Sequence, residues 1–84
     1  MDKEIYNILS DKTTENVFKT VLRLKIISRR DLKRLYNKDI EKSISLLENW
    51  DLVKIEKNGF EDLDKLHPTA NAFQISREIY NYQY

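Results

Sequence analysis

The sequence predicts an α+β domain that is mainly helical and carries one small β-hairpin. Three observations lead to this prediction. Apolar residues recur at helical spacing through the first 50 residues, and the run 52–57 alternates apolar and polar residues as a half-buried strand does. Gly59 and Pro68, the single glycine and the single proline, both fall within 58–69. With 84 residues the chain has the length of one domain, so we expect a single unit over 1–84.

Two helices are predicted before residue 28. A short terminal helix is expected over 3–9 and a longer helix over about 15–25, with Thr13 or Thr14 as the N-cap of the second. The buried face of the second helix is predicted to comprise Val17, Phe18, Val21, Leu22 and Leu24.

Two more helices are predicted over about 29–36 and 40–50. Ser28 followed by Asp31 is typical of a capped helix start with an acid in its first turn, and Asp39 can cap the second helix. The apolar positions that these helices are expected to bury are Leu32, Leu35, Tyr36, Ile40, Ile44 and Leu47.

The remaining residues are predicted to form a wing over about 52–75. Its first strand is the alternating run 52–57, the residues 58–69 form a long loop, and 72–75 form the returning strand. A final helix is expected over 76–83. Three core helices followed by a β-hairpin constitute the winged helix-turn-helix, so this is the predicted fold.

The stretch from Leu9 to Ile55 resembles the ArsR-like winged-helix repressors. ISRRDLKRLY looks like the first helix of that family's helix-turn-helix, and NKDIEKSISLLENWDLVKI looks like its recognition helix running into the wing. The resemblance implies a small DNA-binding transcriptional regulator. The chain departs from the family at Asp51, where glycine is usual, and at Glu41, where small or basic groups are usual.

Basic residues are concentrated in 25–42, where seven basic and three acidic side chains give a net charge of +4. In a helix-turn-helix the first helix crosses the phosphate backbone, and the second enters the major groove of double-stranded DNA. The predicted phosphate contacts are Arg29, Arg30, Lys33, Arg34 and Lys38. The predicted base-facing residues are Glu41, which we expect to be exposed, with Lys42, Ser45 and Asn49.

A second interpretation is that the chain is a protein–protein interaction module or a subunit of a larger assembly. The wing carries Glu61, Asp62 and Asp64, which would be repelled by DNA phosphates. Glu41 and the overall net charge of +1 also favour a protein partner. The polar face of the helix 40–50 is equally typical of an ordinary solvated surface.

Terminal apolar side chains predict that the two ends of the chain pack together and form a homodimer. The interface is expected to involve Ile5, Tyr6, Ile79, Tyr80 and Tyr82. The alternative is that these side chains only close the core of one chain.

The sequence does not predict an enzyme, a metal site or a bound cofactor. There is no Gly-rich phosphate loop and no nucleophile with a base at a recognisable spacing. The absence of cysteine excludes thiolate zinc sites and disulfides, and His67 is a single histidine where metal sensing would need several ligands. No window has the apolar length of a membrane span, and the N-terminus lacks the apolar run of a signal peptide, so we expect a cytoplasmic, DNA-associated protein.

Overall fold

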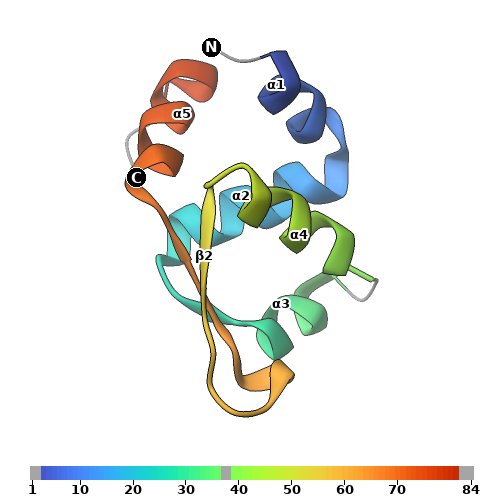
Figure 1. The fold of residues 1–84 in the computed structure, drawn as a ribbon. Coiled ribbons are helices and arrows are strands. Elements are labelled where there is room, and N and C mark those ends of the chain that lie inside the picture. The colour runs from blue at the N-terminus through green and yellow to red at the C-terminus, as the bar shows by residue number, and fades with distance from the viewer. Residues whose placement is uncertain (1–2, 37–38, 82–84) are drawn as a thin grey trace.

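The computed structural model describes residues 3–36 and 39–81, and in this part the chain has the winged-helix arrangement (Figure 1). The molecule measures 35 × 22 × 20 Å. The helices are α1 (Lys3–Ser10), α2 (Lys12–Leu24), α3 (Arg29–Tyr36), α4 (Glu41–Asn49) and α5 (Ala70–Tyr80). The strands are β1 (Ile27–Ser28), β2 (Val53–Glu56) and β3 (Lys65–Pro68), with a short 3-10 turn, η1, at Glu61–Leu63. No helix in the described residues is long and apolar enough to cross a membrane.

The three strands form an antiparallel sheet in the order β1-β3-β2. Leu66 of β3 lies opposite Ile27 of β1 and Ile55 of β2, and Leu66 is fully buried. The tip of the β2–β3 hairpin, at η1, lies beside α3, and α1 and α5 lie at the opposite end of the molecule (Figure 1). The hairpin therefore forms the wing next to the helix-turn-helix made by α3 and α4.

The second strand of the wing comes earlier in the chain than the sequence predicted. The predicted strand 72–75 is wrong, because those residues belong to α5, and the returning strand is β3, inside the predicted loop. Thr69 caps α5, and its hydroxyl accepts a hydrogen bond from the Ala72 backbone N–H at 3.0 Å. Pro68 is compatible with β3 because it is the last residue of that strand.

The helical core agrees with the prediction at most positions. Leu32, Ile44 and Leu47 are fully or almost fully buried, as expected. Three positions differ, since Leu35 is 58% exposed, Leu24 is 45% exposed and Tyr36 is only partly buried. Leu32 is on the inner face of α3, and Leu35 lies to the side of that face. Leu24 is the last residue of α2, at the end of the helix.

The first turns of the helices are capped by short polar side chains. Asp11, and neither Thr13 nor Thr14, is the N-cap of α2, and its Oδ2 accepts from the Thr14 backbone N–H at 3.1 Å. The predicted Ser28 cap is confirmed by a 3.1 Å hydrogen bond from the Asp31 backbone N–H. The N-cap of α4 is Ile40 and not the predicted Asp39, but Asp39 precedes it and its carboxylate accepts from the Glu41 backbone N–H at 3.0 Å. These caps satisfy amide groups that lack partners within the helices.

Asp51 ends α4 in the left-handed conformation, with φ of 57°. The backbone N–H of Leu52 donates to the Leu47 carbonyl at 2.9 Å, and that of Asp51 donates to the Glu48 carbonyl at 3.0 Å. This hydrogen-bond pattern is the helix-ending motif that usually places glycine at the left-handed position. Asp51, which stands where glycine is usual, therefore has a strained backbone conformation.

Replacing Asp51 with glycine is expected to raise the free energy of unfolding by about 0.5–1 kcal/mol, because glycine adopts the left-handed conformation without steric cost. The exposed Asp51 side chain makes no hydrogen bond to the described residues that the change would remove. Chemical denaturation measures the effect. Asn49→Gly, inside the last turn of α4, is the matched control and should lower stability. A loss of stability in both variants would contradict the strain at Asp51.

Candidate nucleic-acid interface

Helix α4 has one face in the core and one face in solvent. Ser43, Ile44 and Leu47 are buried, and the Ser43 hydroxyl is 2.9 Å from that of Thr14 in α2. Three of the predicted base-facing residues are exposed on the other side of the helix: Lys42, Ser45 and Asn49. The structure thus brings these three polar side chains together on one open surface, as the helical spacing predicted.

Arg29 does not belong to that surface, which corrects its predicted role as a phosphate contact. The residue is only 5% exposed. Its guanidinium group donates a hydrogen bond to the Glu41 carboxylate, and its Nη2 lies 3.6 Å from Oδ2 of Asp64. Its backbone N–H also donates to the Asp64 carbonyl at 2.9 Å. Arg29 therefore links the start of α3 to the start of α4 and to the wing.

Glu41 is half-buried and not exposed as predicted from the sequence. Besides its hydrogen bond from Arg29, its Oε1 lies 3.6 Å from Nζ of Lys33. Two cations of α3 thus compensate the carboxylate at the start of α4. The negative charge of Glu41, which would disfavour DNA binding by α4, is therefore paired with cations of the same chain.

The two aspartates of the wing are paired in the same way. The Asp64 side chain is 3% exposed, lies 3.6 Å from Lys57 Nζ as well as from Arg29, and accepts from the Asn58 backbone N–H at 3.1 Å. Asp62 accepts a 3.0 Å hydrogen bond from Lys33. This hydrogen bond, together with the charges of Asp62 and Glu41, raises the pKa of the Lys33 ammonium group above its ordinary value.

We define the acid-pairing cluster as these six side chains: Arg29, Lys33, Glu41, Lys57, Asp62 and Asp64. It contains three cations and three anions, so its formal charge is zero. The cluster joins α3, α4 and the wing through side chains from all three. The concern that an acidic wing repels DNA therefore applies to the exposed Glu61 but much less to Asp62 and Asp64.

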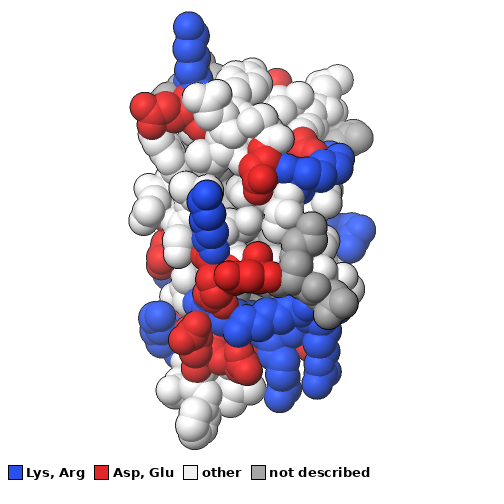
Figure 2. All heavy atoms as spheres, turned by 90° about the vertical axis from the view of Figure 1, so that its right-hand side faces the viewer, with Lys and Arg blue, Asp and Glu red and all other residues white. Residues whose placement is uncertain are grey.

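Among the described residues of the helix-turn-helix, the exposed basic side chains outside the acid-pairing cluster are Arg30, Arg34 and Lys42. All three are exposed, and Arg34 has only a weak pair with Asp31 at 4.0 Å. Figure 2 shows the face that includes α3 and α4, where Lys and Arg side chains gather in the lower half beside a group of Asp and Glu. Lys38, the fifth predicted phosphate contact, lies outside the described residues.

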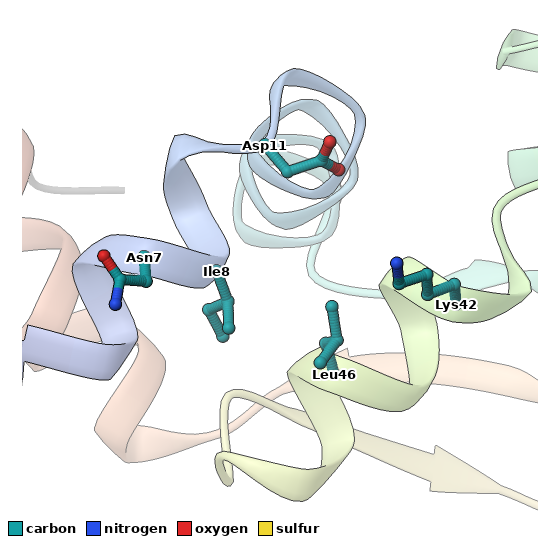
Figure 3. A pocket seen from close by; sticks show the side chains of 5 residues that line it. All are labelled: Asn7, Ile8, Asp11, Lys42 and Leu46. Carbon is teal, nitrogen blue, oxygen red and sulfur yellow. The ribbon is translucent and has the colours of Figure 1, made fainter.

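A pocket of about 290 Å³ opens beside α4, on the side away from the acid-pairing cluster. Lys42 and Leu46 of α4 line it from one side (Figure 3). Asn7, Ile8 and Asp11, from α1 and the junction between α1 and α2, line it from the other. No local sequence pattern predicts this pocket, because its two walls are about 30 residues apart in the chain and come together only through packing.

The residues predicted for a dimer interface have different surroundings in the structure. Ile5 is 7% exposed and belongs to the chain's own core, so it is not available to a second chain. Ile79 and Tyr80 are half-buried against the same core, and the Tyr80 hydroxyl donates to Glu15 of α2 at 3.2 Å. Tyr6 is 49% exposed. Tyr82 lies outside the described residues.

His67 pairs with a carboxylate and not with other potential metal ligands. Its Nε2 lies 3.1 Å from Oε1 of Glu56 on the neighbouring strand. Within residues 3–36 and 39–81, no three His, Cys, Asp or Glu side chains are placed to hold a metal ion. In comparisons with protein families, curated proteins and solved structures, no significant match to the chain was found.

Proposed function

We propose that this winged-helix chain binds double-stranded DNA as a small transcriptional regulator, with α4 as its recognition helix. The observation that carries the proposal is the pairing of Glu41, Asp62 and Asp64 within the acid-pairing cluster. Because those acids are compensated internally, the open face of α4 presents Lys42, Ser45 and Asn49, with Glu48 as the exposed acid at its edge. The resemblance of residues 9–55 to ArsR-like repressors supports the same function.

Each exposed side chain has a role that its chemistry allows. On α4, the Asn49 amide can pair with an adenine edge, and Lys42 and Ser45 can donate to base or phosphate acceptors. On α3, Arg30 and Arg34 are exposed where the first helix of the motif crosses the phosphate backbone. Phosphate contacts of this kind supply affinity that depends strongly on salt.

The proposal is tested by measuring affinity for duplex DNA of random sequence over a series of salt concentrations. The unmodified chain should bind at low salt and lose affinity steeply as salt increases. Replacing Arg30 or Arg34 with glutamine should reduce the slope of log K against log salt by about 0.9 each, because one phosphate contact is lost. Arg77→Gln on α5 is the matched control, since Arg77 is exposed on a helix outside the helix-turn-helix.

Binding to a protein partner is the second candidate function, and two exposed apolar side chains favour it. Phe60, next to the wing tip, is 75% exposed, and Leu35 of α3 is 58% exposed. Large apolar groups on a surface are typical anchors of protein interfaces. No DNA binding at low salt would reject the first proposal and favour this one.

The homodimer stays a prediction, and the structure narrows the surface that it can use. With Ile5 inside the core, the part of a terminal interface that falls within residues 3–36 and 39–81 would use Tyr6 and the accessible parts of Ile79 and Tyr80. Light scattering at high protein concentration measures the mass directly. Twice the mass of 10.1 kDa would support the dimer, and a single-chain mass would reject it.

A further inference from the structure

We propose that the free edge of strand β2 pairs with the same edge of a second copy of the chain, so that the two sheets join across a two-fold axis. β2 is an edge strand, because the strand order of the sheet is β1-β3-β2. An unpaired edge presents a row of backbone N–H and C=O groups that another strand can use. This interface uses none of the terminal residues predicted for a homodimer.

The backbone groups of Val53 and Ile55 face the free edge of β2. The Thr69 N–H donates to the Leu52 carbonyl at 3.4 Å, so these two residues form a hydrogen-bonded pair just before the β2–β3 ladder. In antiparallel strands the backbone groups of successive residues face opposite edges. The groups of Lys54 therefore face β3, and those of Val53 and Ile55 face outward. The outward groups make no hydrogen bond to another part of the described chain.

The charged side chains of β2 select one register for the two copies. In a two-fold antiparallel pair centred on Ile55, Lys54 of each copy lies directly opposite Glu56 of the other. A register centred on Lys54 would bring two ammonium groups together, and one centred on Glu56 would bring two carboxylates together. Like charges directly opposite each other destabilise a strand pair. The register centred on Ile55 is therefore the one that the charges favour.

Lys54 and Glu56 are both available for these ion pairs. They are exposed on the outer face of the sheet, whereas Val53, on the inner face, is buried. Lys54 makes no ion pair with another described residue. Glu56 is 56% exposed, and only its Oε1 is paired, with Nε2 of His67 at 3.1 Å. Lys54, Glu56 and His67 line a hollow of about 360 Å³, which leaves room for side chains of the second copy.

Ile55 adds an apolar contact at the two-fold axis. Its side chain is half-buried against the core of its own chain. In the proposed register the two Ile55 residues form the central hydrogen-bonded pair, and each covers apolar surface that the other leaves accessible. Cross-strand pairs of β-branched residues stabilise antiparallel strands. The interface is short, so we expect a weak dimer whose population depends on protein concentration.

The same charges make the edge selective for its own sequence. A lysine on an edge strand usually prevents unwanted pairing with other chains. In a second copy, Glu56 supplies the charge that Lys54 needs, so self-pairing escapes this penalty. The inference does not rest on the proposed function, because the dimer is measured with protein alone and in the absence of DNA.

Sedimentation equilibrium over a range of protein concentrations measures the dissociation constant of the dimer. Lys54→Glu makes the edge acidic and Glu56→Lys makes it basic, so each variant alone should dimerise at least about tenfold more weakly than the unmodified chain. An equimolar mixture of the two variants should dimerise as well as the unmodified chain, because an acidic edge then faces a basic edge. Circular dichroism of each variant checks that it is folded.

Two controls separate this interface from the rest of the surface. Arg77→Glu makes the same change of charge on the exposed face of α5, and Tyr6→Ala removes an exposed terminal side chain. Both should leave the dissociation constant unchanged. A single-chain mass of the unmodified protein at the highest concentration would overturn the proposal. A dimer that Tyr6→Ala abolishes and that neither β2 variant weakens would also overturn it.

Amide hydrogen exchange tests the backbone register. The Ile55 N–H should exchange more slowly as protein concentration rises, because it donates to the carbonyl of Ile55 in the second copy. The Lys54 N–H, which faces β3, is the internal control, and its exchange should not depend on concentration. If the Ile55 N–H exchanges at one rate in monomeric and in dimeric samples, the pairing of the two β2 strands is rejected.

Discussion

Replacing Arg29 with methionine is expected to lower the free energy of unfolding by about 1–3 kcal/mol, because it removes the buried one of the two cations that compensate a buried carboxylate. That carboxylate is Asp64, whose side chain is 3% exposed, and Glu41 loses a hydrogen bond as well. Small domains have a total stability of about 5–15 kcal/mol, so the variant should lose a large share of it. Urea denaturation followed by circular dichroism measures the change.

Two further variants show whether the loss comes from the buried carboxylate of Asp64, which then keeps only Lys57 as a cationic partner. Lys33→Met removes a cation from the exposed side of the same cluster and should cost much less than Arg29→Met. Combining Arg29→Met with Asp64→Asn removes the buried charge and should recover part of the stability. Equal costs for Arg29→Met and Lys33→Met would contradict the buried position of Arg29.

Leu47→Ala is expected to cost about 2–5 kcal/mol, since it leaves a cavity among packed helices. Leu47 is fully buried on the inner face of α4. Leu35→Ala is the matched control, because Leu35 is 58% exposed and the same truncation there should change stability by less than about 0.5 kcal/mol. The difference between the two melting temperatures checks the orientation of both helices. A cost at Leu35 as large as that at Leu47 would contradict it.

The elements that could be predicted from the sequence are those with a local signal. Helix α3 follows directly from the Ser28 cap and the spacing of Leu32 and Tyr36. Strand β3 was missed because Leu66 is its one fully buried residue, and a four-residue strand with one such position shows no alternation. The helical conformation of residues 72–75 could have been predicted, since Ala72, Ile75 and Ile79 recur at helical spacing.

Arg29 shows why the candidate site was only partly predictable. By composition it is indistinguishable from Arg30, and both were assigned to phosphates. Its spacing to Leu32 and Tyr36, three and seven residues on, places it on the inner face of α3, while Arg30 points to solvent. That spacing could have separated the two arginines. The acceptors for Arg29 could not be predicted, because Glu41 and Asp64 reach it only after α4 and the wing have packed.

The exposed set on α4 was easier to predict than the pairing of the acids. Lys42, Ser45 and Asn49 follow from helical spacing alone, and the structure leaves all three exposed. The compensation of Asp62 by Lys33 joins residues 29 positions apart. The pocket beside Lys42 likewise depends on the packing of both α1 and α4 against α2.

The most direct test of the account is an NMR titration of isotope-labelled protein with duplex DNA at low salt, read residue by residue. The account predicts that the backbone signals of Lys42, Ser45 and Asn49 shift together with those of Arg30 and Arg34. The signals of Leu24 and Ile26, which are exposed outside these two helices, should stay in place. Shifts confined to residues other than those of α3 and α4, or no shifts at all, would contradict the assignment of α4 as the recognition helix.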